Sequence, residues 1–236
     1  MSCKELIIKG ERFVYEDESE TITYDNIQPI TIEDAKHLLH RTKQLFDKIG
    51  LPMFLAYGTL LGAVREKSLI SGDEDVDVYV TDEQKLYDNI PWLNDNGLRL
   101  CRRYKGALYS FKINKDAYID VYILRKYKNA LWAVNCFSLC GLATPKRYFR
   151  KSGTIELFGD LYHCPYPPEE ILEFWYGKDW RIPQKGHHYI CEIKVAYYWK
   201  NLIRPIFSKI IKTIIFYRYW KKYRYDSAIE KSSDKE

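Results

Sequence analysis

The stretch that decides the fold runs from residue 56 to residue 80 and reads AYGTLLGAVREKSLISGDEDVDVYV. A helical segment, TLLGAVREK, is followed by a turn and then by VDVYV, whose valines alternate with Asp77 and Tyr79. This alternation is typical of a strand with one face in a core and the other face available for function. Four acids gather at the turn and the start of this strand, at positions 73, 74, 75 and 77.

The spacing of Asp75 and Asp77 predicts a metal site. Side chains two positions apart on a strand share a face, about 7 Å apart along the chain. Carboxylates this close raise each other's pKa unless a cation neutralises them. Hard oxygen ligands suit Mg²⁺ or Mn²⁺. A solvated acidic loop is the alternative, and the flanking valines weaken it because they tie the acids to a packed strand.

Asp120 is the candidate for a third carboxylate. It lies inside AYIDVYIL, residues 117–124, a strongly apolar strand-like run. A lone charge in such a run is costly to bury without a partner. If this strand lies beside residues 75–80, Asp120 completes a three-carboxylate site. The alternative is a structural salt bridge between Asp120 and a nearby arginine.

Gly58 and Thr59 stand at a strand-to-helix turn upstream of the acids. The free backbone N–H groups at a helix start, together with a threonine hydroxyl, suit a phosphate group. Arg65 follows about two turns along the same helix, and a guanidinium can hold a phosphate through two hydrogen bonds. For Arg65 the alternative is an ion pair with Glu66 or another acid.

The rest of the chain predicts an α+β class with a mixed sheet flanked by helices. Thr31 is expected to cap a helix that stops at Gly50 and Pro52, and Pro91 is expected to break a second helix. A hairpin is expected to turn at Gly159-Asp160. Helices are predicted within 31–50, 82–97 and 168–176, and strands within 53–57, 98–104, 107–113, 117–124 and 153–167.

Composition bounds the possible classes of protein. The 236 residues are 46% apolar, enough for a sizeable core. The net charge is +5, but residues 194–225 hold nine basic and no acidic residues, so the rest of the chain carries −4. A slightly acidic body argues against a nucleic-acid-binding core. The six cysteines form no C-x-x-C pair, so reduced thiols are expected rather than a zinc knuckle or a disulfide framework.

The combined motifs resemble a known family. The run YGTLLGAVR at 57–65, followed by D-x-D-x-D at 73–77, is similar to the signature of the LicD/fukutin family of phosphotransferases. A second block, residues 158–188, resembles the family's later block with its Y-G-x-D-W-x-x-P element. Together the matches cover roughly 54–80 and 117–188. Two features depart from the family pattern: Ser71-Gly72 follows Ile70 where the family usually has proline, and Glu74 replaces a frequent Asp or other polar residue.

The resemblance implies a polymerase-β-like nucleotidyltransferase fold. It also implies transfer of a phosphorylated small alcohol, such as phosphocholine or a polyol phosphate, from a CDP-activated donor to a glycan or glycolipid hydroxyl, with release of CMP. By this likeness Asp75, Asp77 and Asp120 are catalytic acids and ligands of Mg²⁺ or Mn²⁺. Asp73 matches the first acid of the run and is a further ligand candidate. Asp120 is also the candidate to accept the proton of the acceptor hydroxyl.

Other positions take roles from the same likeness. Gly58, Thr59 and Arg65 match the phosphate-side motif. His188, or its neighbour His187, is a candidate for a phosphate contact, with an ordinary surface position as the alternative. In the later block, Gly177 and Trp180 are expected to act structurally.

These observations divide the chain into a catalytic domain, 1–188, a basic amphipathic helical segment, 189–225, and a disordered tail, 226–236. The basic segment has the composition of a helix that lies on an anionic membrane surface, and a helix pair packed on the domain is the alternative. No leader and no apolar run of about 18 residues occurs, so a cytoplasmic chain, peripheral at a membrane, is expected.

Two other functions compete with the phosphotransferase. A classical nucleotidyltransferase would use a nucleoside triphosphate and release pyrophosphate. A non-catalytic membrane-docking module would be marked by the loss of an acid, and none of the three is lost.

Overall fold

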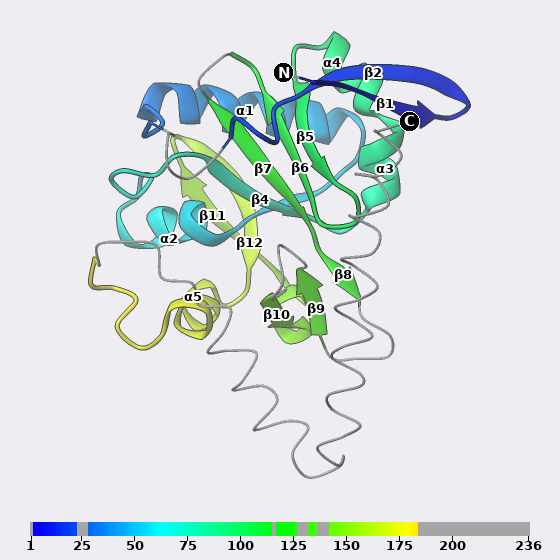
Figure 1. Ribbon diagram of the computed structural model, residues 1–236. Helices are drawn as coiled ribbons and strands as arrows, with labels where there is room; N and C mark the ends of the chain where they lie inside the picture. Colours follow the sequence, from blue (N-terminus) through cyan, green and yellow to red (C-terminus); the bar gives the residue numbers. More distant parts are fainter. Residues whose placement is uncertain (1, 23–27, 115–116, 127–131, 136–141, 184–236) are drawn as a thin grey trace.

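A seven-stranded mixed sheet forms the centre of the protein (Figure 1). The computed structural model describes residues 2–22, 28–114, 117–126, 132–135 and 142–183. The strand order is β11-β12-β3-β4-β7-β6-β5. The predicted α+β class with a mixed sheet is confirmed. The strands of this sheet are β3 Met53–Leu55, β4 Val76–Val80, β5 Arg99–Tyr104, β6 Leu108–Lys112, β7 Tyr118–Ile123, β11 Ser152–Leu157 and β12 Asp160–Pro165.

The middle of the sheet brings together strands that are far apart in the sequence. β4 and β7 are parallel neighbours, with Asp77 opposite Asp120 and Val78 opposite Val121. On one side β3 pairs antiparallel with β4, and β12 adds parallel to β3. On the other side β5, β6 and β7, which lie within three predicted strand ranges, form an antiparallel meander. The β4–β7 pairing therefore places the two predicted acidic strands side by side.

Helix α1, Ile32–Lys48, covers one face of this sheet. Thr31 caps it as predicted, and its hydroxyl accepts a hydrogen bond from the Asp34 backbone N–H. The apolar stripe of the helix is fully buried, and the helix contacts β4 and β7. Because valines alternate with Asp77 and Tyr79 along β4, packing the valines into the core directs Asp77 to the opposite face.

Two helices lie near the opposite face of the sheet. Helix α2, Tyr57–Arg65, follows β3 directly and packs beside β4, and helix α5, Pro168–Tyr176, packs on α2 (Figure 1). Gly177 ends α5 with φ of +93°, a backbone conformation that suits glycine. Trp180 is only 4% exposed. The structural roles expected for Gly177 and Trp180 agree with these positions.

Two short helices replace the broken helix expected within 82–97. α3, Glu83–Asp88, ends at Asn89, and α4, Ile90–Asp95, begins directly after it. Pro91 lies in the first turn of α4, where a missing N–H costs no helical hydrogen bond. The break therefore precedes the proline instead of falling on it.

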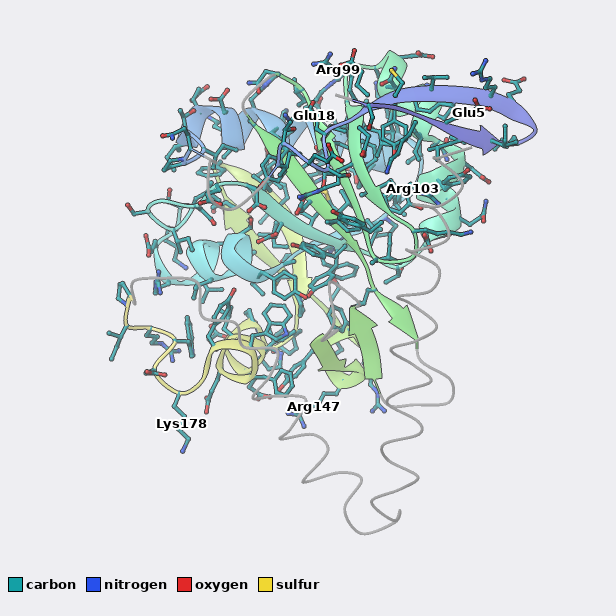
Figure 2. All side chains as sticks on the ribbon, in the orientation of Figure 1. Glu5, Glu18, Arg99, Arg103, Arg147 and Lys178 are labelled. Carbon is teal, nitrogen blue, oxygen red and sulfur yellow. The ribbon has the colours of Figure 1, made fainter. Side chains whose placement is uncertain are left out.

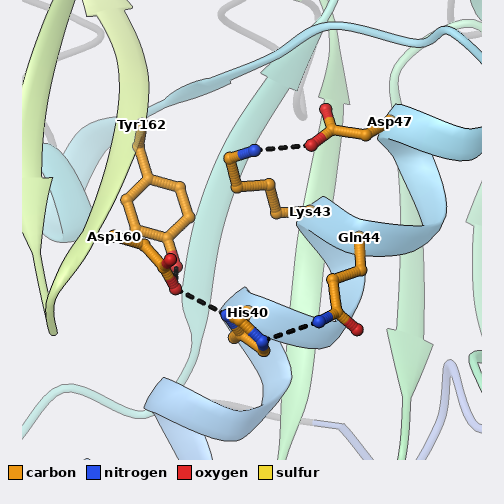
Figure 3. A network of polar contacts seen from close by, with 6 residues as sticks. All are labelled: His40, Lys43, Gln44, Asp47, Asp160 and Tyr162. Carbon is orange, nitrogen blue, oxygen red and sulfur yellow. Dashed lines mark hydrogen bonds and ion pairs between the residues drawn. The ribbon is translucent and has the colours of Figure 1, made fainter.

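The far edge of the sheet is tied to α1 by polar contacts (Figure 3). His40 Nδ1 lies 2.5 Å from an Asp160 carboxylate oxygen at the start of β12, and His40 Nε2 lies 2.8 Å from Gln44 Nε2. Lys43 donates to Asp47 one turn further along the helix. Only the contact between His40 and Asp160 joins the hairpin of β11 and β12 to the helix, and the other two lie within α1.

Several elements were not anticipated from the sequence. The N-terminal strands β1, Ser2–Ile8, and β2, Glu11–Asp17, form a separate antiparallel hairpin that contacts β5. A three-stranded sheet consists of β8, Arg125–Lys126, β9, Trp132–Asn135, and β10, Leu142–Pro145, and it leads into the 3₁₀ turn Lys146–Phe149. No described helix is both long and apolar enough to cross a membrane.

Candidate active site

Three carboxylates meet on the face of the sheet opposite α1. Asp77 is on β4, Asp120 is its direct partner on β7, and Asp75 immediately precedes β4. One oxygen from each of the three lies within 4.8 Å of the others. This is the one group of three or more possible metal ligands among the residues that the structure describes. The chain therefore gathers the three acids that the sequence singled out.

The acids belong to a polar row that crosses four neighbouring strands. Asp77 on β4 faces Asp120 on β7, Asp120 faces Ser110 on β6, and Ser110 faces Arg102 on β5. Arg102 Nη2 lies 3.0 Å and 2.9 Å from the two Asp120 oxygens, and Arg102 Nε donates to Ser110 Oγ at 2.9 Å. Ser110 Oγ in turn donates to Asp120 Oδ1 at 2.5 Å. The salt bridge considered for Asp120 is thus present, and it coexists with the acidic cluster.

The start of α2 supports the acids from the other side. The Gly58 backbone N–H donates to Asp77 Oδ2 at 3.3 Å, and Thr59 Oγ1 accepts from the Asp77 backbone N–H at 2.8 Å. Thr59 is fully buried. These groups were predicted to face a phosphate. In the structure they hold Asp77, because α2 begins beside the first residues of β4. A phosphate contact at Gly58 and Thr59 remains a prediction.

Asp73 lies next to the cluster but is not part of it. A Cβ atom added to Gly58 would come within 2.8 Å of Asp73 Oδ2, so Asp73 closes over the start of α2. That oxygen is buried and has no hydrogen-bond partner among the described residues. Burial raises the pKa of Asp73 to about 7, with Glu74 and Glu66 adding to the rise against a backbone hydrogen bond from Glu74. Its role as a metal ligand remains a prediction.

Burial and mutual repulsion make the acids costly to ionise. Burial, then Asp77, Asp120 and Asp73, raise the pKa of Asp75 well above its ordinary value. Burial, Asp73 and Asp120 do the same for Asp77, against hydrogen bonds from Gly58 and Tyr122. For Asp120, burial outweighs the opposing effects of Arg102, Ser110 and Tyr122, so its pKa is also raised. A site with this electrostatic profile gains most from a bound cation.

A cluster of aromatic rings borders the acids on the same face. Tyr79 and Tyr122 follow Asp77 and Asp120 by two positions on their strands, so they share the face of the acids. The Tyr57 ring packs against both, with centroids at 5.3 Å and 5.1 Å, and against Trp175 of α5 at 5.2 Å. Burial and the nearby Asp77 raise the pKa of Tyr122 well above its usual value. Its hydroxyl therefore remains a proton donor to the acids.

Arg65 is engaged by partners other than the three acids. Its guanidinium donates to Glu66 Oε1 at 2.6 Å and 3.0 Å and to the Trp180 carbonyl at 3.2 Å. The ion pair with Glu66 was the alternative considered for this residue. Binding of a phosphate would require Arg65 to exchange these partners, and that role remains a prediction. His187, His188 and the segments 189–225 and 226–236 lie outside the described residues, so their predicted roles and boundaries are not tested.

Sequence reasoning missed Arg102 and Ser110. The signal was available in retrospect, because Ser110 interrupts the apolar run ALYSFKI and Arg102 lies in LRLCRRY. Strand alternation alone does not identify Arg102, since a β-bulge changes the register of β5 between Leu100 and Arg102. The spatial partner of Asp120 was therefore hidden by a local irregularity.

The donor set fits a hard divalent cation. Three carboxylate oxygens, two of them on the buried residues Asp77 and Asp120, converge within 4.8 Å, and their charges exceed that of the adjacent Arg102. Oxygen-only ligands of this kind suit Mg²⁺ or Mn²⁺. The mixed sheet with acids on two adjacent parallel strands, below a helix that starts beside them, defines a nucleotidyltransferase-type fold with a candidate metal-binding active site.

The comparisons with known proteins agree with this class. The family model described as LicD/FKTN/FKRP, nucleotidyltransferase domain, matches residues 50–164, which include all three carboxylates and both strands that carry them. Over these residues the chain is similar to the LicD family.

Curated relatives share only part of their length with the chain. Ribitol-5-phosphate transferase FKTN of Homo sapiens is 27% identical over 158 residues, which cover 65% of this chain and 34% of that protein. Uncharacterized protein RP689 of Rickettsia prowazekii (strain Madrid E) is 30% identical over 134 residues, 52% of this chain and 48% of that protein. The chain thus spans about a third of the FKTN proteins it matches.

Solved structures resemble it more distantly. Lincosamide antibiotic adenylyltransferase LnuA in its lincomycin-bound form aligns with a TM-score of 0.44 and 13% identity, over 61% of this chain and 85% of that one. The antibiotic-resistance factor ANT(2'')-Ia aligns with a TM-score of 0.45 and 14% identity, over 87% of this chain and 100% of that one.

Proposed function

We propose that the chain is a metal-dependent phosphotransferase that moves a phosphorylated small alcohol, either phosphocholine or a polyol phosphate, from a CDP-activated donor to a glycan hydroxyl and releases CMP. The convergence of Asp75, Asp77 and Asp120 on the face of the β4–β7 pair is the observation that carries the proposal. The match to the LicD family model and the similarity to a protein named ribitol-5-phosphate transferase support the substrate class.

The three carboxylates would hold Mg²⁺ or Mn²⁺ between them. When bound, such an ion neutralises charge on the donor pyrophosphate and lowers the pKa of the acceptor hydroxyl. The protein's own contribution is positioning: Gly58 and Thr59 orient Asp77, while Ser110 and Arg102 orient Asp120. In phosphoryl transfer, positioning and charge stabilisation supply most of the rate.

Asp120 is a weaker candidate for proton acceptor than the sequence suggests. Its Oδ1 accepts hydrogen bonds from Arg102 and Ser110, and its Oδ2 also accepts from Arg102. These hydrogen bonds occupy both carboxylate oxygens and oppose the rise in the Asp120 pKa that burial causes. The geometry therefore favours a ligand role for Asp120, and a cation held by the three acids would supply the activation of the acceptor hydroxyl.

A CMP-release assay tests the proposal. The full chain is incubated with Mn²⁺ and, in separate reactions, CDP-choline, CDP-ribitol and CDP-glycerol, and CMP is measured with and without glycan acceptors. The expected result is acceptor-dependent CMP release from one donor and none in the presence of EDTA. Parallel reactions with nucleoside triphosphates test the alternative, because pyrophosphate release without CMP formation would identify a classical nucleotidyltransferase and overturn the proposal.

We also propose that residues 189–225 bring the enzyme to an anionic membrane surface, where lipid-linked glycans would be acceptors. The support is the nine basic residues within 194–225, interspersed with Ile, Trp and Tyr. Sedimentation with phosphatidylserine-containing liposomes is expected to depend on this segment and to weaken with salt. Equal sedimentation of a chain truncated after Ile193 would refute the idea, and binding without any turnover would favour the non-catalytic docking module.

A further inference from the structure

We propose that Arg102 is a positioning residue of the active site, fixing the Asp120 carboxylate in the orientation in which it binds the metal ion. The assignment rests on the proposed metal-dependent function. No recognised motif of the chain contains Arg102, which comes from the edge strand β5, two strands away from Asp120.

Arg102, Ser110 and Asp120 each form hydrogen bonds with the other two. Arg102 Nη2 contacts both Asp120 oxygens, at 3.0 Å and 2.9 Å, while Arg102 Nε contacts Ser110 Oγ at 2.9 Å. Ser110 then contacts Asp120 Oδ1 at 2.5 Å. The Arg102 and Asp120 side chains are only 8% and 3% exposed. With two residues tied to each other and to Asp120, the carboxylate has little freedom to rotate.

A β-bulge aims Arg102 at this site. Leu100 pairs with Phe111, but the next paired residue of β5 is Arg102, which faces Ser110, so Cys101 is the extra residue. Without the bulge, Cys101 would face Ser110 and the Arg102 side chain would point to the face covered by α1. Bulges beside active sites commonly redirect a side chain in this way. The consequence is that an arginine of an edge strand reaches a carboxylate at the centre of the sheet.

The neighbouring arginine provides the contrast. Arg103, labelled in Figure 2, follows Arg102 on β5. Its side chain points to the other face, where the guanidinium lies 5.0 Å from the Tyr87 ring centroid and 5.4 Å from that of Tyr109. It packs α3 onto the sheet and does not approach the acids. Arg102 and Arg103 thus share a strand and a residue type but not a role.

Charge explains why an arginine is suited to this position. Asp75, Asp77 and Asp120 would place three negative charges within one cluster, in which Asp77 and Asp120 are buried. Arg102 compensates one of them while holding Asp120 at a fixed angle, since the planar guanidinium donates in fixed directions. A buried ion pair adds little net stability compared with apolar packing, so its presence beside the acids is better explained by orientation than by folding energy.

Mn²⁺ binding to the full chain tests the inference without any donor or acceptor. Electron paramagnetic resonance titration gives the dissociation constant for the unaltered chain and for Arg102→Met, Arg102→Lys and the matched control Arg103→Met. Residues that orient metal ligands typically contribute 10- to 100-fold to affinity, so Arg102→Met should bind Mn²⁺ about 10- to 100-fold more weakly. Arg102→Lys should recover part of the loss, and Arg103→Met should bind as the unaltered chain does.

The outcomes separate this inference from the proposed function. If the unaltered chain binds Mn²⁺ and folded Arg102→Met binds it equally or more tightly, Arg102 has no positioning role, while the proposed function survives. If the unaltered chain binds no Mn²⁺, both are overturned. Should Arg102→Met not fold, Ser110→Ala removes one of the ties to Asp120 without leaving a buried charge. Weaker Mn²⁺ binding by Ser110→Ala supports the inference, and unchanged binding refutes it.

Discussion

Asp77 and Asp120 stand opposite each other on parallel neighbouring strands, β4 and β7, although they are far apart in the sequence. Parallel pairing in register brings both carboxylates to one level of the sheet, and alternation along each strand brings both to the same face. This juxtaposition and the groups that support it determine how the protein should respond to substitution, to pH and to metal ions.

Replacing Asp75 or Asp77 should lower the activity while it raises the stability of the metal-free protein. Asp75→Asn and Asp77→Asn each remove one proposed metal ligand. Disturbing a residue that merely supports a ligand typically costs about 10- to 100-fold in activity, so losing the ligand itself should lower turnover by at least that factor, roughly to background. The metal-free protein should become more stable, because a repelling buried charge is removed. CMP release and thermal unfolding with EDTA measure the two effects. Full activity in either variant would contradict the metal assignment.

The stability of the metal-free protein should fall as pH rises. The folded-state pKa values of Asp75, Asp77 and Asp120 are raised, and that of Asp73 is raised to about 7 from 3.8. Between the unfolded and folded pKa values the native state binds more protons than the unfolded state does. The stabilisation that protonated Asp73 contributes is therefore complete below pH 3.8 and is lost as the pH rises through about 7.

Mn²⁺ should reverse this trend, since the metal binds the deprotonated acids. At a metal concentration of 100 times the dissociation constant, the gain is about 2.7 kcal/mol. Melting temperatures from pH 5 to 8, in EDTA and in Mn²⁺, give the measurement, with Asp77→Asn as the control for a flatter profile. A metal-free melting temperature that climbs steadily toward pH 8 would be inconsistent with buried, repelling acids.

Thr59→Val should destabilise the protein more than Thr59→Ser. Thr59 Oγ1 accepts a hydrogen bond from the Asp77 backbone N–H at 2.8 Å in a fully buried position. Valine keeps the shape but leaves a buried N–H without its acceptor, at a cost of about 1–3 kcal/mol. Serine retains the acceptor. Urea denaturation gives the free energies of unfolding, and equal values for the two variants would show that this hydrogen bond has no energetic role.

Replacing either glycine of the GTLLG motif, Gly58 or Gly62, by alanine should destabilise the protein, for a different reason in each case. A Cβ at Gly62 would lie 2.8 Å from the Ile70 backbone nitrogen and closer still to the Ser68 carbonyl, so Gly62→Ala should cost about 1–3 kcal/mol or more of stability. A Cβ at Gly58 would instead meet the side-chain oxygens of Asp73, at 2.8 Å and 3.3 Å.

A second substitution distinguishes the two cases. Asp73→Ala should rescue the stability of Gly58→Ala, because it removes the clashing group, and it should not rescue Gly62→Ala, whose obstacle is backbone. A thermal-unfolding double-mutant cycle gives the coupling between positions 58 and 73. Additive effects there would show that Asp73 does not close over the start of α2.

Local patterns were sufficient to predict most secondary structure. The cap at Thr31, the alternation of VDVYV and the stop at Gly177 depend on interactions within a few residues, and the structure agrees with each. The N-terminal hairpin was missed. The positions of Gly58 and Thr59 at a helix start were predicted, but their contacts with Asp77 depend on the packing of α2 beside β4.

By itself the sequence determined which acids share a face, because strand periodicity fixes the direction of Asp77 relative to the valines beside it. Only the tertiary structure decided that Asp120 lies opposite Asp77, since strand order depends on the packing of the whole sheet. It alone also decided that Arg102 belongs to the site. The bulge at Cys101 reverses the face that simple alternation would assign, and a hydrogen bond from the Cys101 thiol to the Ser110 carbonyl accompanies that local geometry.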